Sequence, residues 1–265
     1  MDTEAILDLM KETAEAVINP RFRALEEGDI SSKSSPGDLV TIADKEAEAH
    51  LTEALARIYP DALIVGEETV FSRPELRWRI PNADHAFVID PIDGTRNFVR
   101  GRDEHGVMLA ETRGGVTTRG WIWQPRTGRG YTVERGAGVL LNGSPLVAER
   151  PDRLPLGASS KDRLQGFTAD GALSPVRRTN FSCAFDYPSI LHGEFDFVFY
   201  TSMHPWDHLA GCLMVTEAGG VARTMDGLAY TVSSRSRGLM VANDTLTWIT
   251  AQQRWPAEPR GSHQG

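Results

Sequence analysis

The sequence contains few cysteines and no long apolar run, and these two absences exclude several classes of protein. Only two of its 265 residues are cysteines, Cys183 and Cys212. Neither has a second cysteine at CxxC spacing, which argues against a thiolate zinc site, so we expect two buried, reduced thiols. No apolar stretch approaches the roughly 20 residues that cross a bilayer. The first 20 residues carry five acids and no basic n-region, which is not the pattern of a signal peptide. We therefore expect a cytoplasmic protein.

Positive charge is also scarce. Thirty-six acidic residues against 28 basic ones give a net charge of −8. A surface of this sign disfavours nucleic acids and anionic membranes as partners. It does not decide what a pocket binds, because a bound cation reverses the local sign. The remaining composition, 40% hydrophobic and 24% charged, is that of an ordinary globular protein.

The order of periodic segments predicts two halves that together form one compact unit. In residues 1–150, amphipathic spacing predicts helices over 4–18, ended by Pro20, and over 44–59, with a mobile Ser- and Gly-rich loop at 27–38 between them. A largely antiparallel sheet follows, with strands expected at 62–65, 87–89, 107–111, 117–123 and 130–134. In residues 151–265, strands near 157–159, 195–200 and 238–242 alternate with helices near 184–192 and 206–218, which is typical of an α/β half. The last residues, from about 258, are expected to be frayed.

The most informative segment is Asp90-Pro91-Ile92-Asp93-Gly94-Thr95, directly after the apolar strand 87–89. Two acids three residues apart at a proline-fixed turn can converge on one point, and the Ile92 carbonyl can point there too. Hard divalent cations prefer oxygen ligands of this kind. Gly94 and Thr95 then offer backbone N–H groups at the start of a short helix, which is suited to a phosphate group.

Three further acidic segments carry less information when each is taken alone. Gly66-Glu67-Glu68 follows an apolar strand, although paired glutamates usually lie on solvated surfaces. Asp207 in Trp206-Asp207 lies at a predicted helix start, where an aspartate often only stabilises the helix terminus. Asp38-Leu39-Val40-Thr41 with Asp44 follows the Ser-rich loop and could be an exposed turn before a capped helix. Their combination with the hexapeptide favours one acidic site.

These motifs together resemble the inositol monophosphatase family of magnesium-dependent, lithium-sensitive phosphatases. The resemblance runs from about residue 5 to 245, and it rests on the Gly-Glu-Glu segment, the hexapeptide and Trp206-Asp207-His208-Leu209-Ala210-Gly211. Thr216-Glu217-Ala218-Gly219-Gly220, Lys33-Ser34-Ser35-Pro36 and Gly136-Ala137-Gly138 with Asn142-Gly143 also match. The resemblance implies a five-layer αβαβα sandwich and a homodimer.

The resemblance also implies a role for each acidic residue. Glu67 is expected to be a metal ligand, and Asp90 to bridge two metals. The Ile92 carbonyl and Asp93 are expected to complete the coordination shells, and Asp207 to serve the second metal. The implied cofactor is Mg²⁺, two or three ions per site, with Mn²⁺ as a substitute. Lithium inhibition is expected at the position that Asp90, Asp93 and Asp207 frame.

The implied catalytic group is Asp44, Glu67 and Thr95, with Thr95 and Asp44 orienting and deprotonating water beside a metal. An outer role falls to Glu68, and Lys33 is expected to approach the metal or phosphate region. His204 and His208, close to the Trp-Asp pair, are expected to have structural or substrate-rim roles. The expected phosphate- and substrate-binding residues are Asp93, Gly94, Thr95, Tyr200 and Asp207.

The alcohol-recognition half departs from the family pattern. Members that hydrolyse inositol phosphates carry an acid seven positions before the Trp-Asp aspartate, where this sequence has Tyr200. Phe181-Ser182-Cys183-Ala184 replaces the usual small residues. We therefore expect a phosphomonoesterase that hydrolyses a small, inositol-1-phosphate-like ester by metal-activated water, with inositol phosphate not its best substrate. The alternatives are a histidinol-phosphate phosphatase and, in another class, a regulatory binding protein of the transcription machinery.

Overall fold

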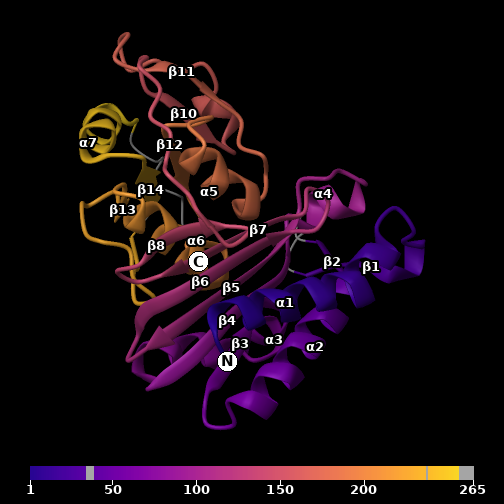
Figure 1. The fold of residues 1–265 in the computed structure, drawn as a ribbon. Helices are drawn as coiled ribbons and strands as arrows, with labels where there is room; N and C mark the ends of the chain where they lie inside the picture. Colours follow the sequence, from indigo (N-terminus) through magenta and orange to yellow (C-terminus); the bar gives the residue numbers. More distant parts are fainter. Residues whose placement is uncertain (34–38, 237, 257–265) are drawn as a thin grey trace, which may run out of the picture.

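The computed structural model describes residues 1–33, 39–236 and 238–256. Two sheets form its framework (Figure 1). The larger has the order β3-β4-β5-β6-β7-β8-β9, and every neighbouring pair is antiparallel except β3 and β4. Its strands are β3 (Leu63–Gly66), β4 (His85–Asp93), β5 (Gly106–Arg113), β6 (Val116–Gln124), β7 (Arg129–Glu134), β8 (Gly138–Leu141) and β9 (Ser144–Pro145).

The smaller sheet has the order β11-β10-β12-β14-β13. Strand β10 runs parallel to both of its neighbours, whereas β14 runs antiparallel to both of its neighbours, β12 and β13. The strands are β10 (Leu156–Ser159), β11 (Ser174–Arg177), β12 (Phe197–Tyr200), β13 (Val221–Thr224) and β14 (Leu239–Ala242). A separate antiparallel pair joins β1 (Ile30–Ser32) to β2 (Leu39–Thr41).

The helices lie on both faces of the two sheets (Figure 1). They are α1 (Thr3–Thr13), α2 (Ile42–Ile58), α3 (Glu67–Ser72), α4 (Thr95–Val99), α5 (Cys183–Leu191), α6 (Pro205–Glu217) and α7 (Thr245–Arg254). Among the described residues, no helix combines the length and the apolar character needed to span a membrane.

Alternating side chains along the strands assign the layers. In β4, Phe87 and Ile89 pack in the same cluster as the apolar faces of α1 and α2, while Ala86 and Val88 pack with α5 and α6. In β12, Val198 packs in the same cluster as Ala86, Val88 and the helices α5 and α6. Its neighbours Phe197 and Phe199 pack on the opposite face of the small sheet, against α7. Because successive strand residues point to opposite faces, the order is α1/α2, large sheet, α5/α6, small sheet, α7. This confirms the expected five-layer sandwich.

Several boundaries differ from the sequence predictions. The first helix continues from α1 as a π-helical turn and then as a 3-10 helix, Asn19–Arg21. Pro20 therefore does not end it, because in the first turn of that segment its missing N–H is not needed. Residues 30–32 of the predicted loop form β1, and residues 34–38 lie outside the described residues, as does the predicted frayed end. Both cysteines are free, as expected.

The predicted turn at Asp90-Pro91 is also wrong. Strand β4 continues to Asp93, which pairs with Gly106 of β5. Its register shifts between Asp90 and Asp93, around a proline that has no N–H to donate. With this shift, β4 continues through Asp90 to Asp93, so both acids belong to the last four residues of the strand.

Candidate active site

Three carboxylates from three elements converge at one edge of the large sheet. Glu67 is the first residue of α3, directly after β3; Asp90 lies in β4; and Asp207 lies in the first turn of α6. One carboxylate oxygen from each lies within 4.8 Å of those of the other two. Strands β3 and β4 are parallel neighbours, so their carboxyl ends meet at the same edge. We call these three residues the acidic cluster.

The acidic cluster has the electrostatics of a cation site. Burial raises the pKa of Asp90 well above its ordinary value, and the charges of Glu67, Asp93 and Asp207 raise it further. Burial and the charge of Glu67 likewise raise the pKa of Asp207. One oxygen of Asp90, Oδ1, is buried and has no hydrogen-bond partner among the described residues. Buried carboxylates so close together are unfavourable unless a cation lies between them, and an all-oxygen donor set suits Mg²⁺ or Ca²⁺.

Asp93 points toward the other half of the chain. Its Oδ2 accepts hydrogen bonds from the Ser182 hydroxyl (2.5 Å) and from the backbone N–H of Ala184 (2.8 Å). Burial raises its pKa to about 6, although these hydrogen bonds act in the opposite direction. Asp93 therefore joins the end of β4 to the first turn of α5.

Gly94 fixes the turn that follows. Its φ of +85° is left-handed, and a Cβ there would lie 2.9 Å from the carbonyl oxygen of Glu104 and 3.0 Å from the Ser182 Cβ. Glycine is therefore required for both conformation and space. Thr95 is then the first residue of α4, which confirms the short helix expected after the hexapeptide. The phosphate-binding role of Gly94 and Thr95 stays a prediction.

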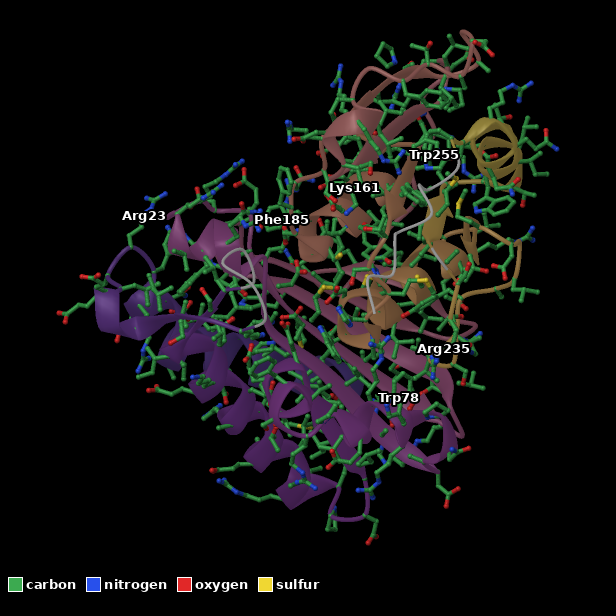
Figure 2. All side chains as sticks on the ribbon, turned by 180° about the vertical axis from the view of Figure 1, so that it is seen from behind. Arg23, Trp78, Lys161, Phe185, Arg235 and Trp255 are labelled. Atoms are coloured by element: carbon green, nitrogen blue, oxygen red, sulfur yellow. The ribbon has the colours of Figure 1, made fainter. Side chains whose placement is uncertain are left out.

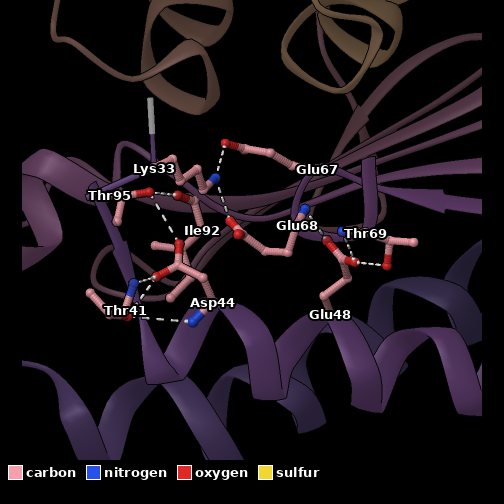
Figure 3. A network of polar contacts seen from close by, with 9 residues as sticks. All are labelled: Lys33, Thr41, Asp44, Glu48, Glu67, Glu68, Thr69, Ile92 and Thr95. Carbon is pink, nitrogen blue, oxygen red and sulfur yellow. Dashed lines mark hydrogen bonds and ion pairs between the residues drawn. The ribbon is translucent and has the colours of Figure 1, made fainter. Parts of the chain in front are cut away.

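Asp44 and Thr95 form a second polar group beside the cluster (Figure 3). Oδ2 of Asp44 accepts from the backbone N–H (2.8 Å) and hydroxyl (2.5 Å) of Thr41 in a capping box at the start of α2. Oδ1 lies 3.1 Å from the Thr95 hydroxyl, which is also 3.0 Å from the Ile92 carbonyl oxygen. One hydroxyl hydrogen faces two acceptors, so it can move between them. Burial raises the pKa of Asp44 to about 6.

Lys33 enters the site from the end of β1. Its Nζ lies 2.6 Å from Oε1 of Glu67 and 2.6 Å from Oε1 of Glu68 (Figure 3). Only 4% of the Lys33 side chain is exposed. Burial alone would lower the pKa of Lys33, but the two glutamates outweigh it and the pKa is raised. Burial raises the pKa of Glu68 to about 8 even beside this cation. Lys33 therefore contacts the acidic cluster through Glu67, and its expected approach to a metal or phosphate stays a prediction.

A cavity of about 430 Å³ opens beside the acidic cluster. Glu67 and Asp207 form part of its wall, so the cavity and the cluster share these two carboxylates. The other lining residues are Lys33, Val70, Phe71, Pro74, Arg77, Trp78, His204 and Trp206.

Comparison with known proteins shows the family of this chain. A model described as the inositol monophosphatase family matches residues 2–257. The chain belongs to the inositol monophosphatase family.

Relatives within the inositol monophosphatase family carry different names. An inositol-1-monophosphatase of Mesorhizobium japonicum is 30% identical over 242 residues, which is 86% of this chain and 88% of that protein. A protein of Pseudomonas aeruginosa named Nus factor SuhB is 29% identical over 222 residues, 78% of this chain and 80% of that one. The solved structure of a Thermotoga maritima IMPase superposes with a TM-score of 0.78 at 24% identity, covering 94% and 93% of the two chains; this likeness shows the fold.

Tyr200, expected in the substrate-binding set, ends β12. Its ring stacks on Tyr187 with the centroids 5.7 Å apart and lies 4.7 Å from the ring of His208. Its hydroxyl is buried and has no hydrogen-bond partner among the described residues. His208 is buried and bonds the Tyr187 hydroxyl and the Ser202 carbonyl oxygen. This family member therefore offers no carboxylate at position 200.

Sequence reasoning missed Glu48. Its carboxylate accepts from the backbone N–H groups of Glu68 (2.6 Å) and Thr69 (2.8 Å) and from the Thr69 hydroxyl (2.5 Å; Figure 3). It thereby caps α3 and fixes the turn that begins with Glu67. A signal was present, because Glu48 follows Asp44 by four residues and so lies one helical turn along the same face.

Proposed function

We propose that this protein is a Mg²⁺-dependent phosphomonoesterase that hydrolyses small phosphorylated alcohols. The observation that carries the proposal is the convergence of Glu67, Asp90 and Asp207, with a buried Asp90 oxygen that has no hydrogen-bond partner among the described residues. No Ser, Cys or His nucleophile is required for this chemistry. A phosphate monoester carries nearly two negative charges at neutral pH, so an acidic site can accept it only when cations are present.

The three carboxylates of the acidic cluster would hold two or three ions, with Asp93 and the Ile92 carbonyl beside them. Mg²⁺ held there, or Mn²⁺ in its place, would offset the phosphate charge and supply Lewis-acid activation of a water and of the leaving oxygen. The protein itself supplies the proton path, because the Thr95 hydroxyl can donate to the Asp44 carboxylate or to the Ile92 carbonyl oxygen as the protonation state of Asp44 changes. Gly94 and Thr95 hold the phosphate at the start of α4. Glu48 and Lys33 keep Glu67 in place.

The test is hydrolysis by purified protein, stripped with EDTA and then given Mg²⁺. The esters are glycerol 2-phosphate, inositol 1-phosphate, histidinol phosphate and p-nitrophenyl phosphate. Asp90→Asn should lose about 10³-fold or more in kcat, since it removes a charge and an oxygen from the cluster. Asp8→Asn, an exposed acid on α1, is the matched control and should keep full activity. No hydrolysis of any ester with Mg²⁺ would overturn the proposal and favour the regulatory alternative. An Asp90→Asn variant that keeps more than a tenth of kcat would show that the acidic cluster does not carry the hydrolysis.

We further propose that inositol 1-phosphate is hydrolysed without being the best substrate. The stacked ring of Tyr200, with its buried hydroxyl, offers a polyol no acceptor of the strength of a carboxylate. Lithium should inhibit, because Asp90, Asp93 and Asp207 are all present. Inositol 1-phosphate with the highest kcat/KM in a broad panel would refute the substrate part, and full activity at high Li⁺ and low Mg²⁺ would refute the lithium part.

A further inference from the structure

The cavity beside the acidic cluster has flat aromatic walls. Trp78 is 51% exposed and Phe71 is 58% exposed, which is unusual for side chains of this size. Next to Asp207 in the cavity wall, the rings of His204 and Trp206 stack face to face, 4.8 Å apart and 3° from parallel. Exposed π-faces bind a planar ring well and gain little from a polyol.

Two cations flank one of these rings. The guanidinium carbon of Arg235 lies 4.3 Å from the centre of the Trp78 ring, and that of Arg77 lies 5.3 Å from it. Figure 2 shows Trp78 and Arg235 side by side, although they come from opposite halves of the chain. Burial lowers the pKa of Arg77, and the nearby charge of Arg235 lowers it too.

Neither guanidinium forms an ion pair with a carboxylate within the described part of the chain. Arg77 instead bonds the Met203 carbonyl oxygen and His204 Nδ1, both at 3.1 Å. Its Nε is buried and has no hydrogen-bond partner there. Arg77 lines the cavity, and Arg235 lies over the Trp78 ring without lining the cavity itself. The two positive charges on this side favour an anionic group in the cavity.

The cavity shares Glu67 and Asp207 with the acidic cluster, so a phosphate at the cluster can place its ester group between these walls. We propose that the cavity is a binding subsite for the outer part of the alcohol, beyond the part that meets Tyr200, which does not line the cavity, and that it takes a planar heteroaromatic ring that carries a negative charge. This inference rests on the proposed function. It disfavours histidinol phosphate, because the two guanidinium groups repel an amine.

A matched series of esters tests the inference. Ribose 5-phosphate has no heteroaromatic ring, uridine 5′-monophosphate adds a neutral one, and orotidine 5′-monophosphate adds a carboxylate to that same heteroaromatic ring. All three present the same primary alcohol to the phosphate. We expect kcat/KM to rise about 10-fold from the first to the second and about 5-fold from the second to the third.

Variants separate the ring from the charge. Trp78→Ala should remove the gain between ribose 5-phosphate and uridine 5′-monophosphate, and Trp78→Phe should retain most of it. Arg235→Gln should remove only the gain from the carboxylate, mainly through KM. Arg223→Gln is the matched control, because Arg223 also lies over an indole, that of Trp248 (5.6 Å), away from the cavity.

The two proposals fail in different ways. If glycerol 2-phosphate is hydrolysed with Mg²⁺ but the three ribose esters have equal kcat/KM, or if Trp78→Ala changes all three equally, the subsite is refuted and the proposed function stands. If no ester is hydrolysed, the proposed function fails, and saturation-transfer NMR of the metal-free protein with orotidine and uridine tests the subsite alone. Stronger transfer to the orotidine ring than to the uridine ring, lost in Arg235→Gln, would support the subsite; equal transfer would overturn it.

Discussion

The effects of substitutions at Gly66 and Glu48 on the free energy of unfolding should not be additive. A Cβ at Gly66 would lie 2.0 Å from Cδ of Glu48 and 2.3 Å from its Oε2, far inside contact distance. Glu48 cannot easily move, because its carboxylate accepts three hydrogen bonds from Glu68 and Thr69. Gly66→Ala must therefore displace a buried carboxylate and break at least one charge-assisted hydrogen bond. We expect it to lower the free energy of unfolding by about 3 kcal/mol.

Glu48→Ala should also cost about 3 kcal/mol, since it leaves the N–H groups at the start of α3 without their acceptor. In that background the atoms nearest to the new Cβ are gone, so adding Gly66→Ala should cost less than about 0.5 kcal/mol. The double variant then loses about 3 kcal/mol rather than about 6, a coupling of about 3 kcal/mol.

The assay is urea unfolding of the two single variants, the double variant and Gly28→Ala. Gly28 is the control, because a Cβ there meets nothing within 4 Å. Additive costs in the double variant would refute the contact as the cause. A loss of more than about 1 kcal/mol in Gly28→Ala would show that alanine itself, and not the contact, is responsible.

Three further predictions concern buried groups. Without metal, Asp90→Asn should be more stable than the wild type at pH 7 by about 1 kcal/mol or more, because the raised pKa of Asp90 makes its ionised form unfavourable in the folded state. Urea unfolding in EDTA measures this difference in stability, and a less stable Asp90→Asn would contradict the prediction. Burial lowers the pKa of His105 from 6.5 to about 4, so between these values the unfolded state binds a proton that the folded state does not, and stability falls as the pH drops. At pH 5 the free energy of unfolding should be about 2 kcal/mol lower in the wild type, and this loss should be absent in His105→Phe. Equal pH profiles of stability in the two proteins would rule out this role of His105. Tyr200→Phe removes a buried hydroxyl without a hydrogen-bond partner among the described residues, so thermal unfolding should show no destabilisation beyond about 0.5 kcal/mol, and a larger loss would reveal a partner.

The sequence predicted the parts of this fold that follow from strong local patterns. The apolar periodicity of α2, α5 and α6 and the strands of the large sheet are readable because each buries one face. The end of β4 was not readable, because its last four residues include two acids and a proline, and pairing with β5 overrides that composition. Strand β1 was missed for the same reason, since its serines suggest a loop.

The candidate site shows the same division. Glu67 and Asp90 were found because each comes directly after an apolar run that the sequence marks as a strand, although β4 in fact continues past Asp90. Glu48 and Arg77 were missed because each acts through residues distant in sequence: Glu48 through the start of α3, and Arg77 through Met203 and His204. Such contacts exist only after the layers have packed.

The central claim is that the acidic cluster binds the Mg²⁺ on which hydrolysis depends. Calorimetric titration of Mg²⁺ into EDTA-stripped wild type and Asp90→Asn, alongside the rate of ester hydrolysis at each free Mg²⁺ concentration, tests it most directly. We expect no activity in EDTA, a rate that rises with the wild-type binding isotherm, and loss of both binding and rate in Asp90→Asn. Undiminished hydrolysis by chelated protein, or wild-type Mg²⁺ binding by Asp90→Asn, would contradict the account.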